Sequence, residues 1–135
     1  MDYSLFDNAK CISMIYKEKM PDLQNVDIAK MEIEPGEDAV IYMNIDTTEL
    51  PQDMPPKWLM RNVNTVQFLI AFISIEFIEF NLTNGINCNI AISDNNGKKR
   101  VCITNNTDGK RICFYTKWIY ANEISAHINN TSGQN

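Results

Sequence analysis

The sequence lacks the signals by which most enzymes are identified. It contains no glycine-rich phosphate-binding loop, no GxSxG nucleophile elbow and no zinc-binding HExxH motif. Its one histidine, His127, stands near the C-terminus, and no two cysteines have the CxxC spacing. Neither a zinc site nor a Cys–His nucleophile is therefore indicated. We predict a protein that is not an enzyme and that has no metal or cofactor.

An excess of positive charge and long apolar runs are also missing. The 135 residues include 12 Lys and Arg against 17 Asp and Glu, a net charge of −5, which argues against electrostatic binding to nucleic acid. The most apolar stretch, residues 66–80, contains two glutamates and is too short to span a bilayer. The first residues show no signal peptide. We expect a cytoplasmic protein that contacts neither nucleic acid nor a membrane.

The composition suits one globular domain over residues 1–135. Hydrophobic residues make up 44% and charged residues 21%, and a chain of this length can bury a core without disulfides. The four cysteines, at positions 11, 88, 102 and 113, are expected as reduced thiols packed in the core. Cys102 and Cys113 flank the turn at 105–110, so a hairpin there would let them face each other, and whether they are paired stays open. Residues 129–135 are expected to form a disordered polar tail.

Apolar periodicity predicts one helix followed by strands. Helical spacing covers Asp7 to Lys19 and ends before Pro21. Beyond Pro21 the period becomes two, which indicates strands. The expected strands span residues 26–34, 40–46, 63–74, 75–82, 87–93, 100–104, 110–116 and 118–128.

The connections complete the predicted fold. Residues 47–62 contain three prolines, which exclude a helix interior or a central strand, so we expect a long surface loop with Trp58 packed on the core. Turns at Thr83-Asn84-Gly85 and Asp94-Asn95-Asn96-Gly97 separate later strands, and residues from Val63 onward should form a meander. The predicted class is α+β, mostly an antiparallel β-sheet of about eight strands with one N-terminal helix.

Acidic side chains are concentrated in one segment. Between Asp22 and Asp53 nine acidic residues stand against a single base, Lys30, so the rest of the chain is net basic. If the first hairpin exposes its polar face, that face would attract a basic partner and speed its association. A face that merely keeps the protein soluble explains the same charges equally well.

Two smaller charge patterns have simple structural explanations. Glu76 and Glu79 could be a glycosidase-like pair, but their spacing in a strand places them on opposite faces unless a bulge intervenes. The bases at 98–100 and 110–111 could form a phosphate-binding patch. Charged residues that flank turns and protect sheet edges are the simpler interpretation.

One stretch resembles a known family. Pro55-Pro56-Lys57-Trp58, the segment 62–67 and the strand pair through Ile73-Ser74-Ile75-Glu76 are similar to the immunity protein fifty family of bacterial polymorphic toxin systems. Ile112-Cys113-Phe114 and Glu123-Ile124-Ser125-Ala126 resemble its closing strands. The similarity spans about residues 26–128. It implies a small cytoplasmic protein that binds and neutralises a cognate toxin, and such toxins are often nucleases with basic surfaces.

We therefore predict a stoichiometric antitoxin of bacterial contact-dependent systems that binds its toxin through an acidic surface. The alternative is a ligand-binding β-barrel or sandwich without catalytic activity, which would need an apolar pocket of roughly 300–1,000 Å³. An edge strand could also mediate homodimers, and the sequence leaves this open. The expected partner-binding residues come from the charge argument and not from the family: Glu32, Glu34, Glu37, Asp38, Asp46 and Trp58.

Overall fold

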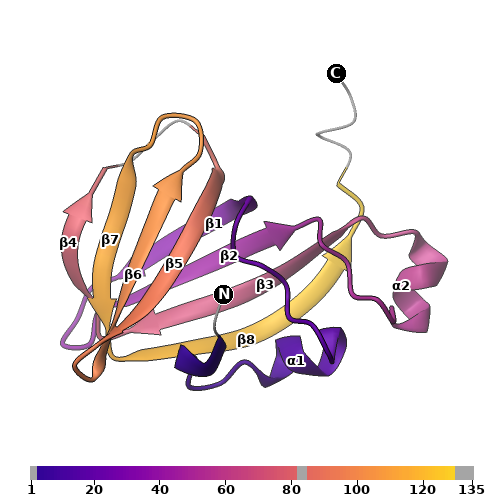
Figure 1. Ribbon diagram of the computed structural model, residues 1–135, viewed down its shortest axis with the longest axis horizontal. Coiled ribbons are helices and arrows are strands. Elements are labelled where there is room, and N and C mark those ends of the chain that lie inside the picture. Colours follow the sequence, from indigo (N-terminus) through magenta and orange to yellow (C-terminus); the bar gives the residue numbers. More distant parts are fainter. Residues whose placement is uncertain (1–2, 82–84, 130–135) are drawn as a thin grey trace.

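The computed structural model describes residues 3–81 and 85–129 (Figure 1). Thr83 and Asn84 of the predicted turn 83–85, and residues 130–135 of the predicted tail 129–135, lie outside these residues. The helical elements are a short 3-10 turn, η1 (Tyr3–Leu5), α1 (Lys10–Tyr16) and α2 (Pro56–Arg61). The strands are β1 (Val26–Glu34), β2 (Val40–Thr47), β3 (Thr65–Ile73), β4 (Glu76–Phe80), β5 (Asn87–Asn95), β6 (Lys98–Asn105), β7 (Arg111–Thr116) and β8 (Trp118–His127).

The eight strands that the described residues form belong to one antiparallel sheet in the order β4-β7-β6-β5-β1-β2-β3-β8. The predicted α+β class with a mostly antiparallel sheet is confirmed. The sheet folds into two halves, which Figure 1 shows at a steep angle to each other. The first half-sheet is β1, β2, β3 and β8, and the second is β4, β5, β6 and β7. They are joined at one corner by β1 and β5, which pair only at Val26↔Cys88 and Asp27↔Asn87.

At the other corner two pairs of consecutive strands bend together. β3 turns into β4 through Ser74, which has a φ of 63°, and β7 turns into β8 through Lys117. The Lys117 N–H donates to Ile73 O at 3.1 Å, and the Thr116 hydroxyl lies 2.8 Å from the same oxygen. The bend explains why the predicted meander is wrong. Of the described strands from β3 onward, only β5, β6 and β7 follow one another across the sheet, whereas β4 pairs with β7 and β8 with β3.

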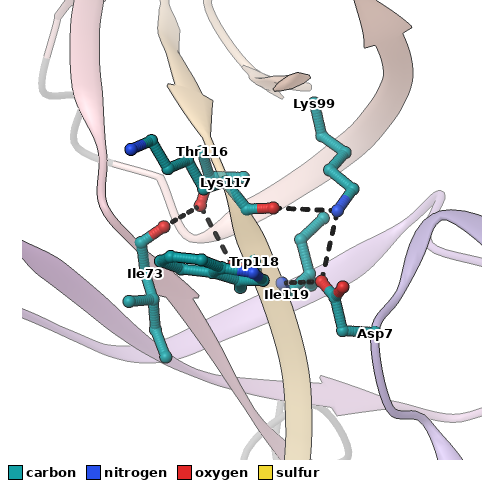
Figure 2. Close-up of polar contacts among 7 residues, drawn as sticks. All are labelled: Asp7, Ile73, Lys99, Thr116, Lys117, Trp118 and Ile119. Carbon is teal, nitrogen blue, oxygen red and sulfur yellow. Dashed lines mark hydrogen bonds and ion pairs between the residues drawn. The ribbon is translucent and has the colours of Figure 1, made fainter. Parts of the chain in front are cut away.

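Asp7 ties the N-terminal segment to this corner (Figure 2). Its Oδ2 accepts hydrogen bonds from the Lys99 ammonium at 3.2 Å and from the Ile119 N–H at 2.8 Å. The Lys99 ammonium also donates to Lys117 O at 2.8 Å. One carboxylate thus connects the segment before α1, the start of β6 and the start of β8.

The core lies between the two half-sheets. On β2, every second residue from Ile41 to Thr47 is buried, as expected for a strand with one face inward. Phe72 on β3 meets Phe114 on β7 edge to face, with ring centroids 5.1 Å apart. The N-terminal segment adds Phe6, Ile12 and Tyr16, and α1 packs beside β8.

Both helices differ from the prediction. α1 is shorter than expected because Lys17 adopts a φ of 59°, which ends the helix at Tyr16. The expectation of a helix-free loop at 47–62 is wrong, because α2 occupies residues 56–61. Pro56 stands in its first turn, where a missing N–H costs nothing, and Asn62 ends it in the left-handed conformation. Trp58 does pack against the core, as predicted.

The four cysteines are free thiols. The expectation that they pack in the core holds for Cys88, and Cys11 is half-buried against that core. Cys102 and Cys113 are buried but lie outside the core cluster, directly opposite each other on β6 and β7. Within the described residues, no helix has the length and apolar character needed to cross a bilayer.

Candidate functional site

The outer face of the first half-sheet gathers acidic side chains from β1 and β8 and aromatic side chains from β2 and β8. Since the buried residues of β2 face inward, the alternate residues face outward, and strand register fixes their neighbours. The resulting rows across the strands are Lys30–Asn44–Leu69–Glu123, Glu32–Tyr42–Ala71–Tyr120 and Glu34–Val40–Ile73–Trp118. We call the surface formed by these three rows the outer face.

A groove of about 340 Å³ runs over the middle of the outer face. Its charged lining is three carboxylates, on Glu32, Glu34 and Glu123, and one ammonium, on Lys30. The Lys30 ammonium lies 2.7 Å from the Glu32 carboxylate, and this hydrogen bond raises the pKa of Lys30. The other two carboxylates have no cation in the groove, so its net charge is negative.

Aromatic rings lie beside these carboxylates. Tyr42 lines the groove, Tyr120 is in the same row, and Trp118 is 40% exposed at the end of the next row. The Lys117 ammonium lies 5.9 Å from the Trp118 ring centroid. Figure 2 shows Trp118 between Thr116 and Ile119, both of which hold the bend through hydrogen bonds. Partly exposed aromatic rings of this kind are enriched at protein-binding surfaces.

The groove contains two of the six predicted partner-binding residues. Glu32 and Glu34 both line the groove. Glu37 and Asp38 lie in the exposed β1–β2 turn, where Asp38 accepts a hydrogen bond from the Ser74 hydroxyl at 3.2 Å.

The other two candidates lie away from the turn. Asp46 stands near the opposite end of β2, about 20 Å along the strand from the turn, and accepts a hydrogen bond from Gln67 Nε2 at 2.7 Å. Trp58 is on α2, half-buried against the core.

Sequence reasoning missed Glu123 and Tyr120 as neighbours on one face. A strict period of two puts them on opposite faces of β8. The register shifts between Leu69 and Ile70, which pair with Glu123 and Ala121, so Asn122 is the extra residue of a bulge. The bulge turns both side chains outward. No feature of the sequence around Asn122 marks the bulge.

The remaining sequence candidates do not form a catalytic arrangement among the described residues. The exception that the sequence left open applies to Glu76 and Glu79: a bulge between Phe77 and Glu79 intervenes and puts both carboxylates on the same face. They pair with different bases, Lys98 at 3.9 Å and Arg111 at 3.0 Å. His127 lies 4.0 Å from Asp46. Across residues 3–81 and 85–129, no three His, Cys, Asp or Glu side chains gather as metal ligands would.

An apolar cavity of about 220 Å³ opens where β1 separates from the second half-sheet. Ile28, Met31, Ile103 and Ile112 contribute to its lining. Its volume falls below the roughly 300–1,000 Å³ that small-molecule sites usually need. The cavity therefore gives the ligand-binding alternative little support.

Fold and surface define an antiparallel β-sheet protein with a negatively charged, aromatic-flanked groove on one side of its folded sheet. The family model described as Immunity protein 50 matches residues 8–127 of the chain. The chain therefore belongs to the immunity protein 50 family, as the sequence resemblance indicated. No curated protein matches it. No solved structure matches it either.

Proposed function

We propose that the protein is a cytoplasmic antitoxin that binds a cognate toxin of a polymorphic, contact-dependent system and blocks it stoichiometrically. Membership of an immunity protein family supports this role. The toxin's contact surface is proposed to be basic, as in a nuclease domain, and to bind on the outer face.

The groove with its three carboxylates is the observation that carries this proposal. Glu32 and Glu34 come from the acidic first hairpin, and Glu123 comes from β8. Carboxylates on a sheet face attract a basic partner over long range and fix its orientation. Tyr42, Tyr120 and Trp118 supply apolar area of the kind that anchors an interface.

The test begins with tagged protein used to capture partners from the source organism at low and high salt. Mass spectrometry identifies a retained toxin, and the recombinant toxin domain is then titrated against the protein by calorimetry. The proposal requires a one-to-one complex that suppresses toxin activity and weakens as salt rises. A chain that leaves the toxin fully active would refute the antitoxin role.

A charge-matched pair of variants tests the surface separately. Glu34→Lys changes the groove, whereas Glu18→Lys makes the same change in net charge beyond the end of α1, where the side chain is also exposed. We expect Glu34→Lys to cost roughly 2 kcal/mol, about thirtyfold in Kd, and Glu18→Lys to cost much less. Equal losses would show that overall charge matters and that the outer face is not the contact surface.

A further inference from the structure

Cys102 and Cys113 form a dithiol across the β6–β7 hairpin. The two residues are register partners. The core cluster includes the neighbours of Cys102 on β6, Val101 and Ile103. It also includes their register partners on β7, Phe114 and Ile112. Because side chains alternate across a strand, the two cysteines project from the side of the second half-sheet that faces away from the core.

The hydrogen-bond pattern of the hairpin brings the two cysteines close together. The Asn105 N–H donates to Lys110 O at 2.9 Å, which makes this a hydrogen-bonded pair. Such pairs alternate along an antiparallel ladder, so Cys102 and Cys113, three positions further on, are a non-hydrogen-bonded pair. Their Cα atoms then lie about 4.5 Å apart, within the range of about 4.4–6.8 Å that a disulfide spans.

The two cysteines differ in their exposure to solvent. Cys102 keeps 9% of its surface exposed, whereas Cys113 is fully buried. Ala91, opposite Cys102 on β5, is small and exposed. Burial, and a hydrogen bond with the Cys102 thiol, raise the pKa of Cys113 to about 11, while the charge of Arg111 opposes this rise. Cys102 is therefore the thiol that reacts first with a disulfide reagent, and Cys113 is the thiol that completes the exchange.

Two arginines place positive charge beside the dithiol. Arg100 and Arg111 flank the dithiol on β6 and β7, and both guanidinium groups act on Cys113. Arg111 is paired with the Glu79 carboxylate at 3.0 Å, and Arg100 has no carboxylate partner among the described ion pairs. An anionic disulfide would therefore be favoured over a neutral one. The bases that the sequence marked at 98–100 and 110–111 contribute these two guanidinium groups.

We infer that Cys102 and Cys113 are a redox-active dithiol that closes to a cross-strand disulfide by exchange with an anionic low-molecular-weight disulfide of the glutathione type. The Cys102 thiolate attacks one sulfur of the reagent, and the first glutathione leaves as a thiolate that takes up the proton from Cys102. The Cys113 thiolate then attacks the Cys102 sulfur and displaces the second glutathione. Two protein thiols are oxidised and one glutathione disulfide is reduced to two thiols.

The experiment uses the folded full chain in glutathione buffers of graded redox ratio. Remaining thiols are alkylated after unfolding, and the digested protein is analysed by mass spectrometry. We expect a linked Cys102–Cys113 peptide to accumulate as the buffer becomes more oxidising, with Cys11 and Cys88 alkylated throughout. A neutral linear disulfide, bis(2-hydroxyethyl) disulfide, used at the same concentration and pH, should oxidise the pair at least threefold more slowly. Equal rates would remove the anionic preference.

Variants separate the exchange from general thiol oxidation. Cys113→Ser should stop at a stable glutathione adduct on Cys102, whereas Cys88→Ser should still form the linked peptide. A wild-type chain that shows no Cys102–Cys113 link under fully oxidising buffer, or a link through Cys11 or Cys88, would overturn the inference. The assay contains no toxin, so its outcome does not depend on the proposed antitoxin role.

Discussion

Asp7 makes contacts that reach far along the chain. Its carboxylate accepts hydrogen bonds from Lys99 and from the Ile119 N–H, and both side chains of the ion pair are mostly shielded from solvent, at 31% and 16% exposure. The Asp7 N–H also donates to Ile119 O at 2.8 Å. One residue thus holds the N-terminal segment on the corner where β7 becomes β8.

We expect Asp7→Ala to lower the free energy of unfolding by about 1–3 kcal/mol, because the variant leaves a partly buried ammonium and a backbone N–H without their acceptor. Urea unfolding followed by circular dichroism measures the change. Asp7→Asn keeps an acceptor for the Ile119 N–H and should lose less. Equal stability of the wild type and Asp7→Ala would show that this contact contributes nothing to the fold.

A substitution at Glu123 tests the outer face independently of the acidic first hairpin, because Glu123 lies on β8. We expect Glu123→Lys to weaken toxin binding by roughly 1–2 kcal/mol, since it places a cation among the groove carboxylates. Titration calorimetry with the recombinant toxin domain measures the loss. Glu37→Lys in the β1–β2 turn is the comparison. A larger loss for Glu37→Lys would move the contact surface to the turn.

At the scale of elements, helix α2 depends on the packing of one residue, Trp58, against the core. Its six residues are too few for a stable isolated helix, so packing of Trp58 on the core must hold it in place. Trp58 is in the predicted binding set because its proline-rich loop follows the acidic hairpin in the sequence. Its half-buried position on the core supports a contribution to the fold, as the sequence also predicted.

We expect Trp58→Ala to lower the free energy of unfolding by about 1–3 kcal/mol while leaving toxin affinity within about twofold of wild type. Thermal and urea unfolding, together with calorimetry, separate the two effects. Met60→Ala is the matched control, because Met60 lies on the same helix with 84% of its surface exposed. A stable Trp58→Ala protein that no longer binds toxin would return Trp58 to the contact surface.

Most individual strands were well predicted from the sequence, because their causes are local. β1 has the bounds that alternation indicated, and Asn96 and Gly97 both adopt the positive φ of the expected Asn-Gly turn. The bulge at Asn122 was missed, because it depends on how β8 meets β3. The groove that includes Glu123 therefore needed the structure, whereas its β1 carboxylates did not.

At the scale of the whole molecule, strand order was the part that sequence could not supply. β3 and β4 follow each other in the chain but lie at or near opposite ends of the sheet order. Hydrogen bonds around Ile73 stabilise the bend responsible, and these bonds come from Thr116 and Lys117, more than forty residues away. Local propensity carries no information about such distant partners.

Buried acidic protons make the whole fold sensitive to alkali. Burial raises the pKa values of Tyr3 and Tyr16 above their usual 10, and those of Cys88 and Cys113 from 9 to about 11. Above pH 9 the unfolded chain releases these protons before the folded chain does. The free energy of unfolding should therefore be level below about pH 9 and fall between about pH 9 and pH 11.

Urea unfolding at a series of pH values measures this slope. Tyr16→Phe removes one of the phenols, and its free energy of unfolding should fall less steeply with pH than that of the wild type. A free energy that stays constant up to pH 11 would contradict the assignment of these groups as buried in the folded state.

The pairing of β3 with β8 has a consequence for synthesis of the protein. β8 follows every other described strand in the chain, yet it forms one side of the outer face and carries Glu123, Tyr120 and Trp118. A ribosome exposes β3 well before β8 has been synthesised, and long-range pairing of this kind is slow. On the proposed function, nascent chains offer a cell no protection. Survival would depend on finished molecules already in stock when the toxin enters.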